Sequence, residues 1–296
     1  MMKKVIVLLA TFSLYVGAQD LSPKVGLLDI DALNANLASQ GLGFKIEKLE
    51  YIVDPAASSQ AQGRTLFASN HELRNGSQWA PGDARRLADG NNITYLVDPF
   101  FVYANGTIDS EPSIDASFAT WDTVNCSNLS IVKRPYLGGE PNYVLGLIFG
   151  FPANPFLADI TTTGFLPGFV FDIVEPNGSN FILGLTWTFV FLDGNGDPTD
   201  INGDGYDDVA FKEVWYNDSF LWNTNGINHV DLESVALHEN GHALGLGHFG
   251  NVFLTPNGKL HFSPKAVMNA TYFNILRDPL GTDHGAFCGL YANWPE

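Results

Sequence analysis

A short segment near the C-terminus restricts most strongly what this chain can fold into. Residues 238–248 read HENGHALGLGH, and they follow a stretch rich in Leu, Val and Ala that begins after Asp231. Asp231 stands where a helix N-cap belongs, and Gly245 stands where a left-handed residue can end a helix. The pattern therefore predicts a buried helix between them. Residues four apart share one face of a helix, so His238 and His242 are expected to lie side by side.

Two histidines at this spacing can present their ring nitrogens to a single metal ion. If the chain turns sharply at Gly245, His248 can return to the same ion as a third ligand. Three histidines leave the fourth position of a tetrahedral zinc for water, which is typical of a catalytic site. Glu239 projects beside the pair, where it can act as a general base on that water. The alternative is that these histidines are ordinary core or surface residues, and the additional fixed offsets of Gly and His argue against it.

The pattern HExxHxxGxxH resembles the zinc-binding helix of the metzincin metalloendopeptidases, and its detailed form is most similar to the matrixins, the matrix metalloproteinases and their bacterial relatives. Residues 266–270, AVMNA, are similar to the Met-turn of that family, in which a methionine packs beneath the zinc ligands. Met268 is the matching position. The resemblance covers about residues 83–296 and is strongest over 231–270.

This resemblance implies a secreted zinc-dependent endopeptidase that hydrolyses protein or peptide substrates with Glu239 as general base. An extended substrate is expected to add as a strand to an exposed sheet edge, and residues 183–186 are the candidate edge. Residues 269–274 are expected to wall the pocket for the side chain beyond the cut. The alternative function is a calcium-dependent extracellular binding or adhesion module with a silent zinc site, which would have no need of Glu239.

The N-terminus predicts export from the cell. Lys3 and Lys4 precede an apolar run and then small residues, which is the pattern of a signal peptide over residues 1–18. The run is too short to cross a bilayer as a helix, so no membrane association is expected. Residues 19–83 are interpreted either as a removable propeptide or as a permanently packed segment, and residues 84–296 as the matrixin-like catalytic domain.

Charge and cysteine content limit the partners and the compartment. The formal net charge of −17 at pH 7 argues against nucleic acid as a partner. The two cysteines, Cys126 and Cys288, predict one disulfide in an oxidising compartment, with two buried free thiols as the alternative. Neither lies in residues 19–83, so a cysteine cannot hold the zinc site latent from there. A blocking carboxylate could be Asp29 or Asp31, although a role on a surface helix is favoured for both. The sequence does not indicate an oligomeric state.

A second candidate metal site lies in the acidic, glycine-rich residues 193–208. Oxygen side chains at alternate positions, with Gly at the tight turn, suit Ca²⁺. The alternative is a solvated turn between two strands. The candidate ligands are Asp193, Asn195, Asp197, Asp200, Asn202, Asp204 and Asp208.

The hydrophobic pattern predicts an α+β fold with a mostly single twisted sheet, an active-site helix and a C-terminal helix. Helices are expected at residues 27–38, 113–124, 232–245 and 283–291. Strands are expected at residues 44–53, 93–103, 144–151, 181–192 and 209–215.

Overall fold

The structure is a computed structural model. It describes residues 28–55, 62–68, 76–87, 91–99, 108–227, 230–257 and 259–296. The expected signal peptide, residues 1–18, lies outside these ranges. Within them, none of the helices has the length and apolar character needed to cross a bilayer.

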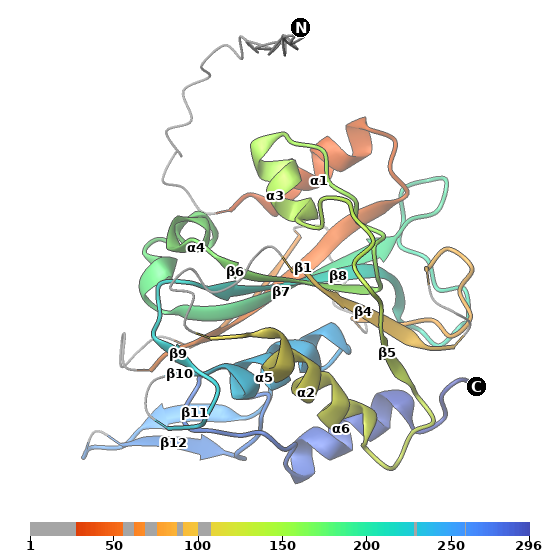
Figure 1. The fold of residues 1–296 in the computed structure, drawn as a ribbon. Helices are drawn as coiled ribbons and strands as arrows, with labels where there is room; N and C mark the ends of the chain where they lie inside the picture. The colour runs from red at the N-terminus through yellow and green to blue at the C-terminus, as the bar shows by residue number, and fades with distance from the viewer. Residues whose placement is uncertain are drawn as a thin grey trace, which may run out of the picture.

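A mixed, eight-stranded sheet forms the centre of the described part of the molecule (Figure 1). The strand order is β2-β1-β7-β8-β6-β4-β5, with the short β3 paired to β8. Strands β5, β4, β6 and β8 run parallel to one another, whereas β7 runs antiparallel to both β8 and β1. The strands are β1 Phe44–Val53, β2 Thr65–Phe67, β3 Ser77–Gln78, β4 Ile93–Val97, β5 Ile131–Lys133, β6 Ile160–Leu166, β7 Ile182–Phe191 and β8 Asp207–Asn217.

Helices cover both faces of the sheet, with α1, α3 and α4 on one side and α2, α5 and α6 on the other (Figure 1). The helices are α1 Ile30–Ser39, α2 Glu111–Asp122, α3 Tyr143–Phe149, α4 Gly168–Val174, α5 Leu232–Ala243 and α6 Gly281–Tyr291, with a 3-10 turn at Gly178–Asn180. Two small ribbons complete the fold: β9 Trp222–Asn223 with β10 Val230–Asp231, and β11 Asn251–Leu254 with β12 Leu260–Ser263.

Each face of the sheet has its own hydrophobic core. Successive side chains of a strand point to opposite faces, so Trp215 packs on the side of α1, α3 and α4, while Val214 and Tyr216 pack on the side of α5. Strand β7 alternates in the same way, and its Thr186 faces α5. Only the strand residues whose side chains point to the α5 face can therefore reach the candidate site, which lies on α5.

The mixed α/β architecture agrees with the expected class at that level of detail. Most expected elements are present, including a strand at residues 44–53 and helices near residues 27–38, 113–124, 232–245 and 283–291. Of the strand expected at residues 93–103, β4 covers residues 93–97, and residues 100–107 lie outside the described ranges.

The strand expected at residues 144–151 is wrong, because this segment forms helix α3. Its first two N–H groups, from Tyr143 and Val144, donate to the Glu213 carboxylate, and Gly150 ends the helix with φ of 77°. A short apolar run fits a buried helix as well as a buried strand. A carboxylate from a distant strand decided between them.

Candidate metal centre

Helix α5 carries the candidate site and begins and ends as its sequence predicts. Asp231 is the N-cap, and its carboxylate accepts the backbone N–H of Ser234 at 3.0 Å. After the last helical residue, Gly245 has φ of 90°, a conformation that L side chains rarely adopt. This turn brings the chain back toward the helix and carries His248 to the same place as His238 and His242.

The three histidines form one cluster. Their ligand-type nitrogens all lie within 4.8 Å of one another, and His242 Nε2 is 3.2 Å from His248 Nε2. Tetrahedral zinc with Zn–N distances near 2.0–2.1 Å separates two ligand nitrogens by about 3.3 Å. His238 Nε2 is buried without a hydrogen-bond partner. The nitrogen set therefore fits a single small transition-metal ion.

Backbone carbonyls fix which ring nitrogen faces the cluster. His238 Nδ1 donates to the carbonyl of Val267 at 2.7 Å, and His242 Nδ1 donates to that of Leu246 at 2.7 Å. Each Nδ1 therefore carries the proton, which leaves the Nε2 lone pair free for a metal. Burial lowers the pKa of both rings, so they are neutral as a metal ligand must be.

Glu239 lies beside the histidine cluster and is fully buried. Its Oε2 accepts a hydrogen bond from Thr186 Oγ1 at 2.7 Å, and its Oε1 has no hydrogen-bond partner. Burial raises the pKa of Glu239 well above its usual range, and the Thr186 hydroxyl partly opposes the shift. One oxygen is thus held in place while the other is free to exchange a proton.

Met268 packs against α5 between the two helical histidines. A Cβ added at Gly241 would lie 2.4 Å from Met268 Sδ, so only glycine allows this close contact. The turn is held by Asp283 of α6, whose carboxylate accepts the N–H groups of Val267 and Met268 at 2.8 and 3.1 Å. Because Val267 also orients His238, α6 supports the cluster indirectly. Asp283 was not identified from the sequence.

Four more side chains, also not identified from the sequence, bind backbone carbonyls of α5. The last four carbonyl oxygens of a helix have no hydrogen-bond partner within the helix. A carbonyl oxygen in the middle of a helix can accept a second hydrogen bond in addition to the one within the helix. The donors, each at 2.6–3.0 Å, are Trp121 to Leu237, Lys212 to His242, Trp79 to Ala243 and Tyr291 to Leu244. They come from α2, β8, α6 and the residue after β3, so only the folded chain, which brings them to α5, could reveal them.

The sheet edge next to Glu239 is not exposed. Strand β1 pairs with β7 along its whole length, so the expectation of a free edge at residues 183–186 is wrong for this chain. A Cβ added at Gly184 of β7 would lie 3.0 Å from Glu239 Cγ, so the strand does lie against the general-base candidate. β1 occupies this edge of β7 because of the order of strands in the sheet, which no local sequence pattern encodes.

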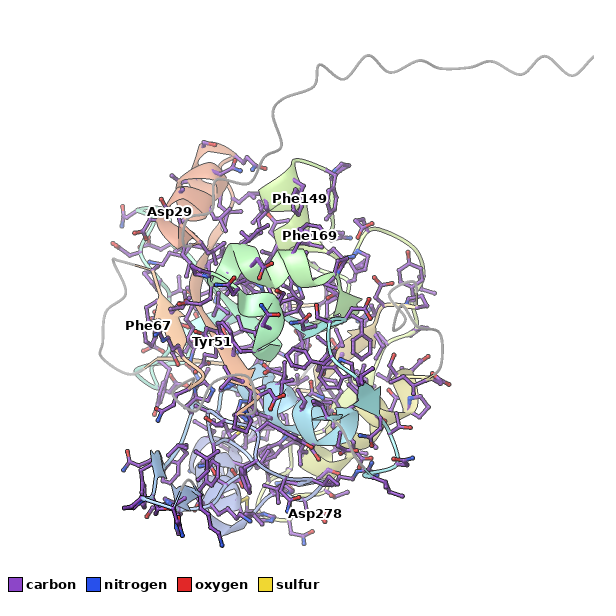
Figure 2. All side chains as sticks on the ribbon, turned by 90° about the vertical axis from the view of Figure 1, so that its left-hand side faces the viewer. Asp29, Tyr51, Phe67, Phe149, Phe169 and Asp278 are labelled. Atoms are coloured by element: carbon purple, nitrogen blue, oxygen red, sulfur yellow. A yellow bond between two sulfur atoms is a disulfide. The ribbon has the colours of Figure 1, made fainter. Side chains whose placement is uncertain are left out.

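The carboxylates considered at the N-terminus lie elsewhere. Asp29 caps α1 by accepting the N–H of Ala32 at 2.9 Å, and Asp31 lies in the first turn of the same helix. Helix α1 is on the opposite side of the sheet from α5 (Figure 1), and Asp29 lies beside that helix (Figure 2). Both residues therefore belong to a surface helix, as favoured above.

The acidic residues of the candidate calcium loop do not form one compact cluster. The carboxylate of Asp193 accepts backbone N–H groups of its own turn, and so does that of Asp200. Asp208 is buried and paired with Arg85 at 2.7 Å. Among the described residues, the histidine trio is the one group of three or more His, Cys, Asp or Glu residues close enough to hold an ion. The calcium site therefore stays a prediction.

If Ca²⁺ gathers these carboxylates, millimolar Ca²⁺ is expected to raise the melting temperature, because a ligand that binds only the folded state stabilises it. The Asp204→Ala variant should lose this response. The exposed Asp278, outside the loop, provides the control, and Asp278→Ala should respond like wild type. Differential scanning calorimetry with and without Ca²⁺ measures the shift. A response that persists in Asp204→Ala would rule this residue out as a ligand.

Cys126 and Cys288 are joined by a disulfide. The first cysteine follows α2 and the second lies in α6, so the bond links two helices that pack around α5. It encloses most of the candidate site within one covalent loop.

The cap of α5 predicts a pH dependence of stability. Burial raises the pKa of Asp231, but hydrogen bonds from Arg277 and Ser234 outweigh it and lower the pKa below its usual value. A depressed pKa means that this stabilisation is present above the unfolded-state pKa, near 4, and is lost as the pH falls. We expect Asp231→Asn to lower the free energy of unfolding by about 1–3 kcal/mol at pH 7 and by less near pH 3.

Urea unfolding of wild type and variant at several pH values measures this difference. Glu233→Gln is the matched control, because Glu233 pairs with the same arginine near the surface and should contribute little. An Asp231→Asn penalty of equal size at pH 7 and pH 3 would contradict the assigned pKa.

Comparison with known proteins adds no family assignment: no protein-family model matches the chain, and no curated protein matches its sequence.

Proposed function

We propose that this chain is a secreted zinc-dependent endopeptidase of the metzincin type, most like the matrixins. The observation that carries the proposal is the convergence of three buried or half-buried histidines, two with fixed tautomers, beside a buried carboxylate that has one free oxygen. A structural zinc site needs no such carboxylate.

His238, His242 and His248 would hold the ion through their Nε2 atoms. When bound there, zinc supplies Lewis acidity, which makes a water nucleophilic near neutral pH and polarises the scissile carbonyl. Glu239 Oε1 accepts a proton from the attacking water and then delivers it to the leaving amine. Thr186 holds the other oxygen, so the carboxylate keeps its orientation throughout.

The neighbouring elements suit an extended peptide substrate. Strand β7 passes directly over Glu239, and the backbone of residues 270–272 lies on the other side of the cleft. Thr271, Tyr272 and Phe273 line a small pocket with Val267 of the Met-turn. Both backbone edges are paired with β1 in this structure; once β1 has left them, they would bind a peptide of almost any sequence, and the pocket would select one side chain.

Removing the metal is expected to abolish the activity, and adding it back is expected to restore it. A chelator should abolish cleavage of a fluorogenic peptide, and stoichiometric Zn²⁺ should restore it, because the ligands are neutral imidazoles that bind transition metals rather than Mg²⁺ or Ca²⁺. Metal analysis of the purified protein should give one zinc per chain at this site, and His242→Ala should remove it. Full activity in metal-free protein would refute the proposal.

A further inference from the structure

We propose that residues 50–53 of β1 occupy the peptide-binding cleft of this site in the orientation of a substrate, so that the full chain is a latent form. The inference rests on the proposed function, since it concerns access to the same site. Four observations carry it: the pairing of β1 on one side, its pairing on the other, the position of the Ile52 side chain and the burial of Glu239.

On one side, β1 takes the place that a substrate strand would take on β7. The pairing is antiparallel, with Ile52 opposite Gly184 and Glu50 opposite Thr186. These two β7 residues are the ones that contact Glu239. A peptide added to this edge would have to replace β1.

On the other side, the same strand is bound by the segment that follows the Met-turn. Tyr272 N donates to Val53 O at 2.9 Å, and Val53 forms a parallel bridge with Thr271. Gly63 N donates to Ala270 O at 2.8 Å, which extends this contact. The main chain of β1 therefore pairs with β7 on one side and with residues 270–272 on the other, as an extended ligand pairs with a sheet edge in strand addition.

The buried Ile52 forms part of the wall of the candidate selectivity pocket. This pocket is lined by Ile52, Ser234, Val267, Thr271, Tyr272, Phe273, Asn274 and Leu276, and only about 10 Å³ of it remains free. Ile52 is 3% exposed. A space of that size holds about one water molecule, so no substrate side chain can enter while Ile52 is in place.

Access from solvent to Glu239 and to the two helical histidines is closed as well. Glu239 and His242 are both 0% exposed, and His238 is 1% exposed. The Glu50 carboxylate of β1 lies 3.5 Å from His242 Nδ1 and is itself 2% exposed. A peptide bond cannot reach Glu239 from solvent in this arrangement. Opening therefore requires residues 50–53 to leave β7.

The first half of β1 packs in the core on the far side of the sheet, whereas the second half covers the candidate site. A register shift between Ile46 and Lys48 separates them. Phe44, before the shift, packs against the rings of Tyr143, Phe156, Phe189 and Phe211 in the opposite core. The half after the shift reaches the cleft. The aromatic contacts of Phe44 favour retention of the first half, whereas activity requires release of the second.

The test uses the full chain loaded with zinc, with two readouts: hydrolysis of a fluorogenic peptide and the rate at which excess chelator removes zinc. In Ile52→Asp, the buried carboxylate should expel residues 50–53 from the pocket. Both rates should rise at least about tenfold over wild type, because only the open fraction reacts. Lys45→Asp, at the far end of β1, is the matched control and should match wild type. Ile52→Ala, a milder change, should raise both rates if Ile52→Asp does not fold.

The outcomes separate this inference from the proposed function. If folded Ile52 variants release zinc and cleave peptide at the wild-type rates, while wild type is active and needs Glu239, β1 does not block the cleft and the inference is wrong. If no variant cleaves peptide but zinc release still accelerates in the Ile52 variants, β1 does cover the site and the endopeptidase assignment fails instead. Acceleration of both rates supports both.

Discussion

Replacing Glu239 with glutamine is expected to lower peptide hydrolysis by about 10²–10⁴-fold while zinc stays bound. Glutamine has nearly the same shape and can keep the contact with Thr186, but it cannot accept a proton from water. The three histidines are untouched, so the metal content should remain near one per chain. The effect should appear in kcat rather than KM, because the lost interaction belongs to the transition state.

The comparison should be made in the Ile52→Asp background as well as in wild type, so that a closed cleft does not mask the loss. Glu233→Gln, on the same helix but away from the histidines, is the matched control and should keep wild-type activity. If Glu239→Gln retains a tenth or more of the activity with zinc bound, Glu239 is not the general base. Loss of zinc from the variant would instead assign Glu239 a role in holding the metal.

The second large effect is expected from the disulfide. Replacing Cys126 and Cys288 by serine should lower the free energy of unfolding by about 5 kcal/mol, because the bond closes a loop with a sequence separation of 162 residues. In the chain-entropy description, a long closed loop restricts the unfolded state most. The loss should also loosen α6 from α2, and with it the Asp283 contacts that hold the Met-turn.

Guanidinium unfolding of the double serine variant and of the oxidised wild type measures this difference. Wild type unfolded in the presence of a reductant serves as the control and should approach the variant. An unchanged guanidinium concentration at the unfolding midpoint in the double serine variant would mean that opening the loop does not increase the conformational entropy of the unfolded chain.

The cap of α5 and the ion pair that strengthens it differ in their dependence on the fold. The Asp231 cap is local, since its partner Ser234 is three residues away, and its position was predicted from the sequence. Its pKa depends on Arg277, which lies 46 residues further along the chain. A sequence pattern identifies such a cap but not the ion pair that sets its strength.

Local sequence by itself determined helix α5, its cap, its end at Gly245 and the candidate ligands His238, His242 and His248. Helical spacing and a left-handed glycine are short-range geometry, so residues 231–248 contain the information. Strand β1 was also recognised as a strand from its composition, because burial and β-propensity are local properties.

Tertiary structure alone decided where that strand pairs. No spacing rule states that β1 lies beside β7, that Ile52 lines a pocket with Val267 of the Met-turn, or that Asp283 and Lys212 support the site. It also turned residues 143–149 into a helix, through the carboxylate of Glu213. These contacts join residues far apart in sequence, and their free energy comes from burial and hydrogen bonds that exist only once the sheet has formed. The candidate metal ligands could therefore be predicted from the sequence, whereas the access of a substrate to them depends on the fold.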